Sequence, residues 1–219
     1  MKPLLLSFVW AVTYYVAISQ GSSTNHIDLA KEFANGHLRV INRSLTVINR
    51  DSGSVYLDAK PVMGTAWLDQ IHFSQGIIEF DIRGRNLLQQ SFVGLAFNRQ
   101  NDSTFEVAYF RPFNFHSPDS FRRTHCVQYM SLPDNGWNKL RTQFPARYEQ
   151  PVHPVPNPED WFHTKLVITA TTVEVFVENS QTPSLVVTRL AKPGMGSIGL
   201  WVDYASEGSF ANLVLTPVK

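Results

Sequence analysis

The sequence predicts an all-β protein, an antiparallel β-sandwich. Short runs of β-branched and aromatic residues, separated by Gly, Pro, Asn and Asp, recur along almost the whole chain. Helical periodicity is nearly absent, and no strand–helix–strand alternation of the kind that builds a parallel sheet is visible. We count roughly eleven to thirteen short strands, which is typical of two packed antiparallel sheets.

The N-terminus has the pattern of a secretory signal. Lys2 precedes a mostly apolar run over residues 3–18, and the small residues Ala17 and Ser19 occupy the positions that a signal peptidase inspects. We expect cleavage after Ser19; the alternative is an uncleaved anchor, because the run is near the short limit for spanning a bilayer. The predicted organisation is a signal peptide over 1–19, a lead-in over 20–35 and the sandwich over 36–219, in a secreted or periplasmic protein.

The amino-acid composition limits the kinds of binding partner that we expect for this protein. The chain has 19 Lys and Arg against 18 Asp and Glu, so it lacks the basic field that attracts nucleic acid or a membrane surface. Cys126 is the single cysteine and excludes an intrachain disulfide, so stability must come from a buried core. We expect a monomer.

In the first half of the chain, the first predicted strands are the short runs at residues 47–48, 55–57 and 65–68. Residues 76–83 then alternate strictly, which places Ile78, Phe80 and Ile82 on the inward face. Residues 91–98 form the next strand, where Gly94 and Ala96 leave room on one face.

The second half continues the pattern after one interruption. Residues 125–131 form a strand, and residues 132–157 break the periodicity, with five of the thirteen prolines. This segment is too rich in apolar residues for a solvated linker, so we expect an ordered loop across one face of the sheet. Strands resume at residues 162–168, 173–177, 184–190, 197–201 and 209–216.

Residues 104–115, TFEVAYFRPFNF, are the most informative stretch. Alternation places Tyr109 and Arg111 on one face of a strand and Glu106 on the other. Pro112 cannot donate to a sheet ladder, so the strand should end there and place Asn114 in a loop. A guanidinium, a phenol and an amide at one strand end suit a polyol or a carboxylate; they also suit a structural ion pair, which this stretch taken alone favours.

These residues give the chain a resemblance to the concanavalin A-like lectin/glucanase superfamily. The resemblance is carried by GIIEFDIR at 76–83, FVGLAF at 92–97 and GSIGLW at 196–201. The segment FANL at 210–213 resembles the closing strand of laminin-G-like modules and of bacterial 3-keto-disaccharide hydrolase domains. The resemblance covers about residues 36–217 and implies a jelly-roll sandwich. It does not imply one activity, because this fold carries lectins, glycosidases and adhesion modules.

Catalytic patterns are incomplete. Laminarinase-like members of the superfamily carry three acids at alternate positions of one strand, whereas this chain has Glu79, Asp81 and then Arg83. We interpret this trio as a solvent-exposed charged strand face. No Gly-x-Ser-x-Gly elbow is present, the histidines lack metal-site spacing, and Asp119 and Asp203 are interpreted as turn residues. No catalytic or metal-binding residue is assigned and no cofactor is expected; calcium, as in some laminin-G-like modules, stays open.

The remaining candidates form a polar and aromatic ligand-binding set. Aromatic rings stack on the apolar faces of sugars while planar polar groups bind the hydroxyls. The set comprises Glu106, Tyr109, Arg111, Asn114, Gln128 and Tyr129, with Trp137, Arg141, Tyr148 and Glu149 from the long loop. We therefore predict a lectin-like protein that binds a glycan or small sugar. The alternatives are a glycoside hydrolase of the 3-keto-disaccharide type and an extracellular adhesion or structural module.

Overall fold

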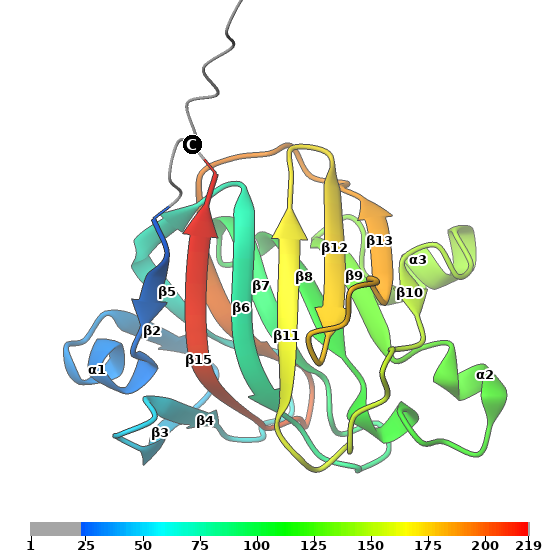
Figure 1. The fold of residues 1–219 in the computed structure, drawn as a ribbon, viewed down its shortest axis with the longest axis horizontal. Helices are drawn as coiled ribbons and strands as arrows, with labels where there is room; N and C mark the ends of the chain where they lie inside the picture. The colour runs from blue at the N-terminus through cyan, green and yellow to red at the C-terminus, as the bar shows by residue number, and fades with distance from the viewer. Residues whose placement is uncertain (1–22, 219) are drawn as a thin grey trace, which may run out of the picture.

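Two antiparallel sheets stack face to face in the computed structural model, which describes residues 23–218 (Figure 1). The eight-stranded sheet has the order β13 (Leu185–Thr188), β12 (Thr172–Val177), β11 (Phe162–Ile168), β6 (Gly76–Arg83), β15 (Gly208–Pro217), β4 (Ser54–Leu57) and β3 (Leu45–Asn49), and β1 (Asn25–Ile27) pairs with β15. The seven-stranded sheet has the order β10 (Glu149–Gln150), β9 (Val127–Leu132), β8 (Thr104–Phe110), β7 (Val93–Asn101), β14 (Gly196–Val202), β5 (Gly64–Phe73) and β2 (Leu38–Ile41). The predicted all-β antiparallel sandwich is confirmed.

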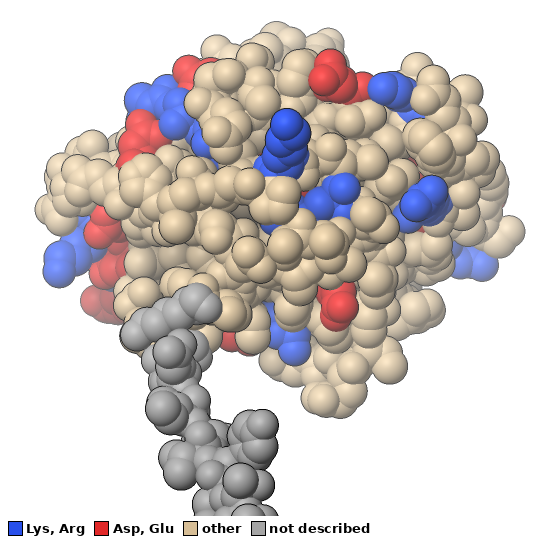
Figure 2. Space-filling model, turned by 90° about the horizontal axis from the view of Figure 1, so that it is seen from above, with Lys and Arg blue, Asp and Glu red and all other residues tan. Residues whose placement is uncertain are grey.

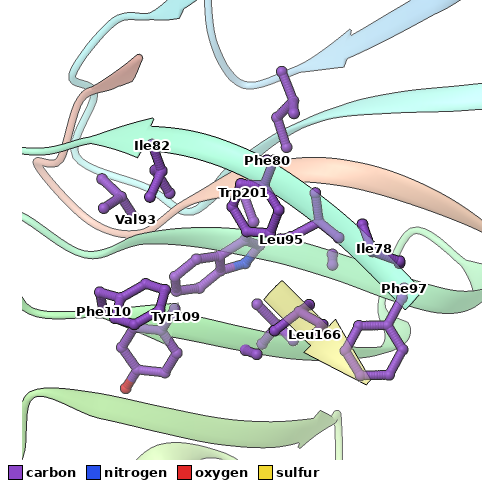
Figure 3. Packing of buried hydrophobic residues seen from close by; sticks show 14 of the residues in the cluster. Ile78, Phe80, Ile82, Val93, Leu95, Phe97, Tyr109, Phe110, Leu166 and Trp201 are labelled. Carbon is purple, nitrogen blue, oxygen red and sulfur yellow. The ribbon is translucent and has the colours of Figure 1, made fainter. Parts of the chain in front are cut away.

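The core lies between the two sheets. Ile78, Phe80 and Ile82 of β6 are 0–1% exposed, as the alternation in the sequence predicts. They pack against Leu95 of β7 and other apolar residues of the seven-stranded sheet (Figure 3). Glu79, on the other face of β6, is half-buried rather than fully exposed. Side chains at every second position of β6 therefore define which face of this sheet is the interior.

Helices occur at the margins of the sandwich, and Figure 1 places α2 and α3 beside the same edge, next to β9 and β10. The helical elements are α1 (Leu29–Ala34), the 3-10 turn η1 (Pro112–Asn114), α2 (Ser120–Arg123) and α3 (Trp137–Gln143). The segment over 132–157 is ordered, but it holds α3 and β10 and is not wholly irregular. The expected lead-in over 20–35 contributes β1 and α1, because β1 pairs with β15 and Leu29 is buried in the core.

The predicted signal peptide lies outside the described residues. Within residues 23–218, no helix has the length and apolar character needed to cross a bilayer. Figure 2 shows Lys, Arg, Asp and Glu scattered over one face of the molecule without a broad field of one sign.

Candidate functional site

A pocket of about 560 Å³ opens where β8 ends. Four separate segments wall it: the loop before β7, the stretch from η1 through α2, the helix α3, and the turn after β14. Its lining residues are Leu88, Gln89, Phe92, Tyr109, Arg111, Phe113, Asn114, Asp119, Phe121, Arg122, His125, Trp137, Arg141, Asp203 and Tyr204. We call it the aromatic-rimmed pocket.

The rim consists of large apolar side chains that face solvent. Phe121 is 67% exposed, Tyr204 58%, Leu88 47% and Trp137 45%. A soluble protein rarely gathers exposed aromatic residues around one hollow unless the surface binds something. A larger groove, of about 680 Å³, crosses the outer face of the eight-stranded sheet, but its lining within residues 23–218 includes no Phe, Tyr or Trp. The aromatic-rimmed pocket is therefore the better candidate.

Strand β8 places the polar floor of the pocket. Phe110 points into the core, where its ring lies 5.1 Å from that of Phe162 in the opposite sheet. Alternation then turns Tyr109 to the outer face of the seven-stranded sheet. Pro112 ends the strand, as predicted, and the chain continues into η1 with Arg111 as its N-cap residue. Tyr109 and Arg111 therefore both reach the pocket.

Three side chains fix one another at this floor. The Tyr109 hydroxyl donates to Gln128 Oε1 at 2.6 Å, and Arg111 Nη2 donates to both the Tyr109 oxygen, at 2.5 Å, and Gln128 Oε1. Burial raises the pKa of Tyr109 to about 12, so the phenol stays protonated and remains a donor. Gly94 makes the packing possible, because a Cβ there would lie 2.6 Å from Tyr109 Cα. The floor is thus rigid before any ligand binds.

Glu149 lies beneath the pocket and interacts with its two arginine side chains, Arg111 and Arg141. It is 2% exposed and accepts hydrogen bonds from Arg141 Nε at 2.8 Å and Nη2 at 2.6 Å. Its Oε2 also lies 3.6 Å from Arg111 Nη1. The Arg141 guanidinium in turn lies 5.2 Å from the centre of the Trp137 ring. The carboxylate therefore positions the rim tryptophan through Arg141.

Several polar atoms of the pocket have no partner among the described residues. These are Asn114 Oδ1 and both ring nitrogens of His125. His125 Nδ1 lies 3.0 Å from Glu149 Oε2, but without hydrogen-bond geometry. Burial lowers the pKa of His125 and raises the pKa of Asp203, so burial favours the neutral form of each. Unpartnered buried polar atoms are groups that a bound polar molecule can satisfy.

The structure divides the predicted ligand-binding set into three groups. Five members line the pocket: Tyr109, Arg111, Asn114, Trp137 and Arg141. Gln128 and Glu149 lie beneath it and hold the lining residues in place. Glu106, Tyr129 and Tyr148 do not line it.

Glu106 points into the space between the sheets. It is 0% exposed and receives hydrogen bonds from Tyr129 Oη at 2.5 Å and from Arg189 Nε at 3.1 Å. Arg189 directly follows β13 in the opposite sheet. Tyr148 stacks on Tyr129 with ring centres 6.0 Å apart and is 3% exposed. Glu106 therefore bridges the sheets and is out of reach of a ligand in the pocket.

Other lining residues had no clear signature in the sequence. Phe121, His125, Asp203 and Tyr204 come from a short helix, a strand start and a turn that look ordinary one at a time. The one available clue is the acid–aromatic pair Asp203 and Tyr204 directly after the strand Gly196–Val202, where the sequence predicts Asp203 as a turn residue.

The two acids of β6, Glu79 and Asp81, lie close to His163 of the neighbouring strand β11. Asp81 accepts a hydrogen bond of 2.8 Å from His163 of β11, and Glu79 Oε1 lies 3.7 Å from the same imidazole. Both acids are half-buried, and they face away from the core. Within residues 23–218, no group of three or more His, Cys, Asp or Glu side chains is arranged to hold a metal ion.

Comparison with known proteins gives the fold. No known family profile and no curated protein matches the sequence. The carbohydrate-binding module CBM66 from Bacillus subtilis is similar at a TM-score of 0.58 and 11% identity, over 82% of this chain and 95% of that one. A structure described as a native glycosidic hydrolase gives 0.57 and 9%, over 91% and 98%. The exoplasmic/lumenal domain of VIP36, bound to Ca²⁺ and Man3GlcNAc, gives 0.53 and 9%, over 84% of each chain. At such identities the likeness concerns architecture, and the chain has the concanavalin A-like jelly-roll fold.

Proposed function

We propose that this protein binds a sugar in the aromatic-rimmed pocket. The observation that carries the proposal is the ring of exposed Phe121, Trp137 and Tyr204 above a floor of Arg111 and Asn114. A volume of about 560 Å³ lies in the range of small-molecule sites. One or two sugar rings fit such a space.

The chemistry of the lining suits a polyol. The C–H faces of a sugar ring pack on aromatic rings, and Trp137 and Tyr204 offer exposed faces for this. Hydroxyl groups need both donors and acceptors; Arg111 supplies donors and Asn114 Oδ1 an unpartnered acceptor. Since hydrogen bonds to Gln128 and Tyr109 already hold Arg111, little conformational entropy is lost on binding.

The structural comparisons support the class of ligand. The similar structures include a carbohydrate-binding module, a glycosidic hydrolase and the VIP36 exoplasmic/lumenal domain with bound Man3GlcNAc. All share the sandwich architecture of this chain, at sequence identities of 9–11%. The identity of the glycan is decided by the lining residues, which differ between such proteins.

A glycan panel tests the proposal. Purified protein is titrated with mono- and oligosaccharides by calorimetry, together with the variants Trp137→Ala and Tyr204→Ala. We expect binding by the wild type and about tenfold weaker binding by each variant, because each loses an aromatic contact of about 0.5–1.5 kcal/mol beyond its buried area. Phe144→Ala is the matched control, since Phe144 is an aromatic 37% exposed next to α3 but outside the pocket.

Equal weakening by Phe144→Ala, or no binding of any sugar, would contradict the proposal. The same incubations, followed by chromatography of the products, test the hydrolase alternative with oligosaccharides and 3-keto-glycosides. Turnover that is lost on substitution of Asp119 or Asp203, the acids that line the pocket, would favour an enzyme. Binding of a protein partner without any sugar would favour the adhesion module.

A further inference from the structure

The buried charges beneath the pocket do not balance. Arg111 and Arg141 share a single buried carboxylate, Glu149, whose hydrogen bonds go to Arg141. The side chains of Arg111 and Glu149 are 6% and 2% exposed, so solvent and salt screen them weakly. The carboxylate oxygen that faces Arg111, Glu149 Oε2 at 3.6 Å, is already hydrogen-bonded to Arg141. Arg111 and Arg141 therefore carry two positive charges against the one negative charge of Glu149.

The two acids that line the pocket, Asp119 and Asp203, form no ion pair with Arg111 within residues 23–218. Asp119 caps α2 by accepting from the backbone N–H of Phe121 at 2.9 Å, and it lies 3.7 Å from Arg122 Nε. Asp203 forms no ion pair with Arg111 or Arg141 within residues 23–218, and burial raises its pKa. Glu149 is therefore the carboxylate that lies against Arg111 in this part of the chain.

Each of the two arginines, Arg111 and Arg141, also keeps one N–H group that is free to bind a ligand. Among the described residues, Arg141 Nη1 and Arg111 Nε make no hydrogen bond, although their neighbouring nitrogens all do. A guanidinium binds a carboxylate more strongly than a hydroxyl, because both partners are charged. Asn114 Oδ1, also unpartnered, can accept only from a donor such as a hydroxyl.

We propose that the pocket selects acidic sugars, with the carboxylate of a uronic-acid-type residue at Arg111 and Arg141 and a ring hydroxyl at Asn114. The inference rests on the proposed sugar binding and names its ligand class. The carboxylate supplies the negative charge that Glu149 alone does not, and the apolar ring face lies against the rim aromatic residues.

Matched ligand pairs test the proposal on the unmodified protein. Methyl glucuronide is compared with methyl glucoside, and methyl galacturonide with methyl galactoside, so that each pair differs only in a carboxylate against a hydroxymethyl group. We expect the acid of at least one pair to bind about tenfold or more tightly, because its carboxylate forms hydrogen bonds in which both partners are charged.

Two variants locate the effect. Asp203→Asn removes the other acid near the floor and should strengthen binding of the acidic sugar relative to its neutral partner, because a negative charge that repels the ligand carboxylate is removed. Arg141→Gln should abolish the preference for the acid, and its melting curve shows whether it folds; if it does not, the ligand pairs and Asp203→Asn still decide.

The outcomes separate the two proposals. Neutral sugars that bind as tightly as their acidic partners overturn the acidic preference and leave sugar binding intact. Failure of every sugar to bind, neutral or acidic, overturns both.

Discussion

The ion pair between Glu106 and Arg189 should be a major contributor to the stability of the sandwich. The two side chains are 0% and 1% exposed, and each comes from a different sheet. Glu106 accepts from both Nε and Nη2 of Arg189, and also from Tyr129 Oη and Asn98 Nδ2 at 2.5 and 2.7 Å. All the acceptor capacity of this carboxylate is therefore used by donors that have no access to water.

Glu106→Gln keeps the shape of the side chain but removes its charge and turns one oxygen into a donor. The guanidinium of Arg189 is then left buried without a counter-charge, and two donors face an NH₂ group. Breaking a buried pair in this way costs about 3–5 kcal/mol. The free energy of unfolding of a globular domain is about 5–15 kcal/mol, so the variant should lose a large share of its stability.

Urea denaturation followed by tryptophan fluorescence measures the effect. Glu174→Gln in β12 is the matched control, because Glu174 is half-buried and makes no ion pair within residues 23–218. We expect this variant to change the free energy of unfolding by no more than about 0.5 kcal/mol. Replacing the pair together, with Glu106→Leu and Arg189→Met, should recover much of the loss, since no unpaired charge remains.

Sugar binding supplies the second measurement. Folded Glu106→Gln should bind sugar like the wild type, because Glu106 does not line the pocket. The reasoning is refuted if Glu106→Gln unfolds at the same urea concentration as the control, or if it stays stable and loses the ligand.

Three further outcomes are expected. The hydrogen bond with Asp81 raises the pKa of His163, so protonated His163 stabilises the fold below about pH 6.5 and the benefit disappears as the pH rises through the raised pKa. The difference in unfolding free energy between wild type and His163→Gln should therefore fall from about pH 5.5 to 8.5, and a constant difference contradicts the assignment. Gly94→Ala places a Cβ 2.2 Å from a backbone carbonyl oxygen of β8 and should cost about 1–3 kcal/mol in denaturation, whereas Gly136→Ala, whose nearest atom is at 3.9 Å, should cost far less. N-terminal sequencing of exported protein should begin near Gln20, and a chain that starts at Met1 would rule out the signal peptide.

The strand pattern was readable because it is local. Alternation over residues 76–83 depends only on the two-residue repeat of a strand, and it identified Ile78, Phe80 and Ile82 as core residues. The end of β8 before Pro112 follows from the missing N–H of proline, which is also local. The very short strands β1 and β10 were not predicted, because two or three residues carry no measurable periodicity.

Assigning the faces of β8 required the tertiary structure. Alternation separated Glu106 from Tyr109, but it could not say which side the second sheet would cover, since both faces carry large apolar residues. The sequence therefore places Glu106 in the predicted ligand-binding set, whereas its partner Arg189 lies 83 positions away in the chain. No local pattern connects residues at that distance.

Local sequence patterns were sufficient to predict the all-β fold class, the core positions of β6 and the end of β8 before Pro112. They also named five residues that line the pocket, three around the end of β8 and two in the segment that forms α3. Only the tertiary structure brought Leu88, Phe121 and Tyr204 to one rim and placed one buried carboxylate under two guanidiniums. The physical reason is that periodicity records which face of an element is buried, whereas a pocket is formed where loops from distant parts of the chain meet.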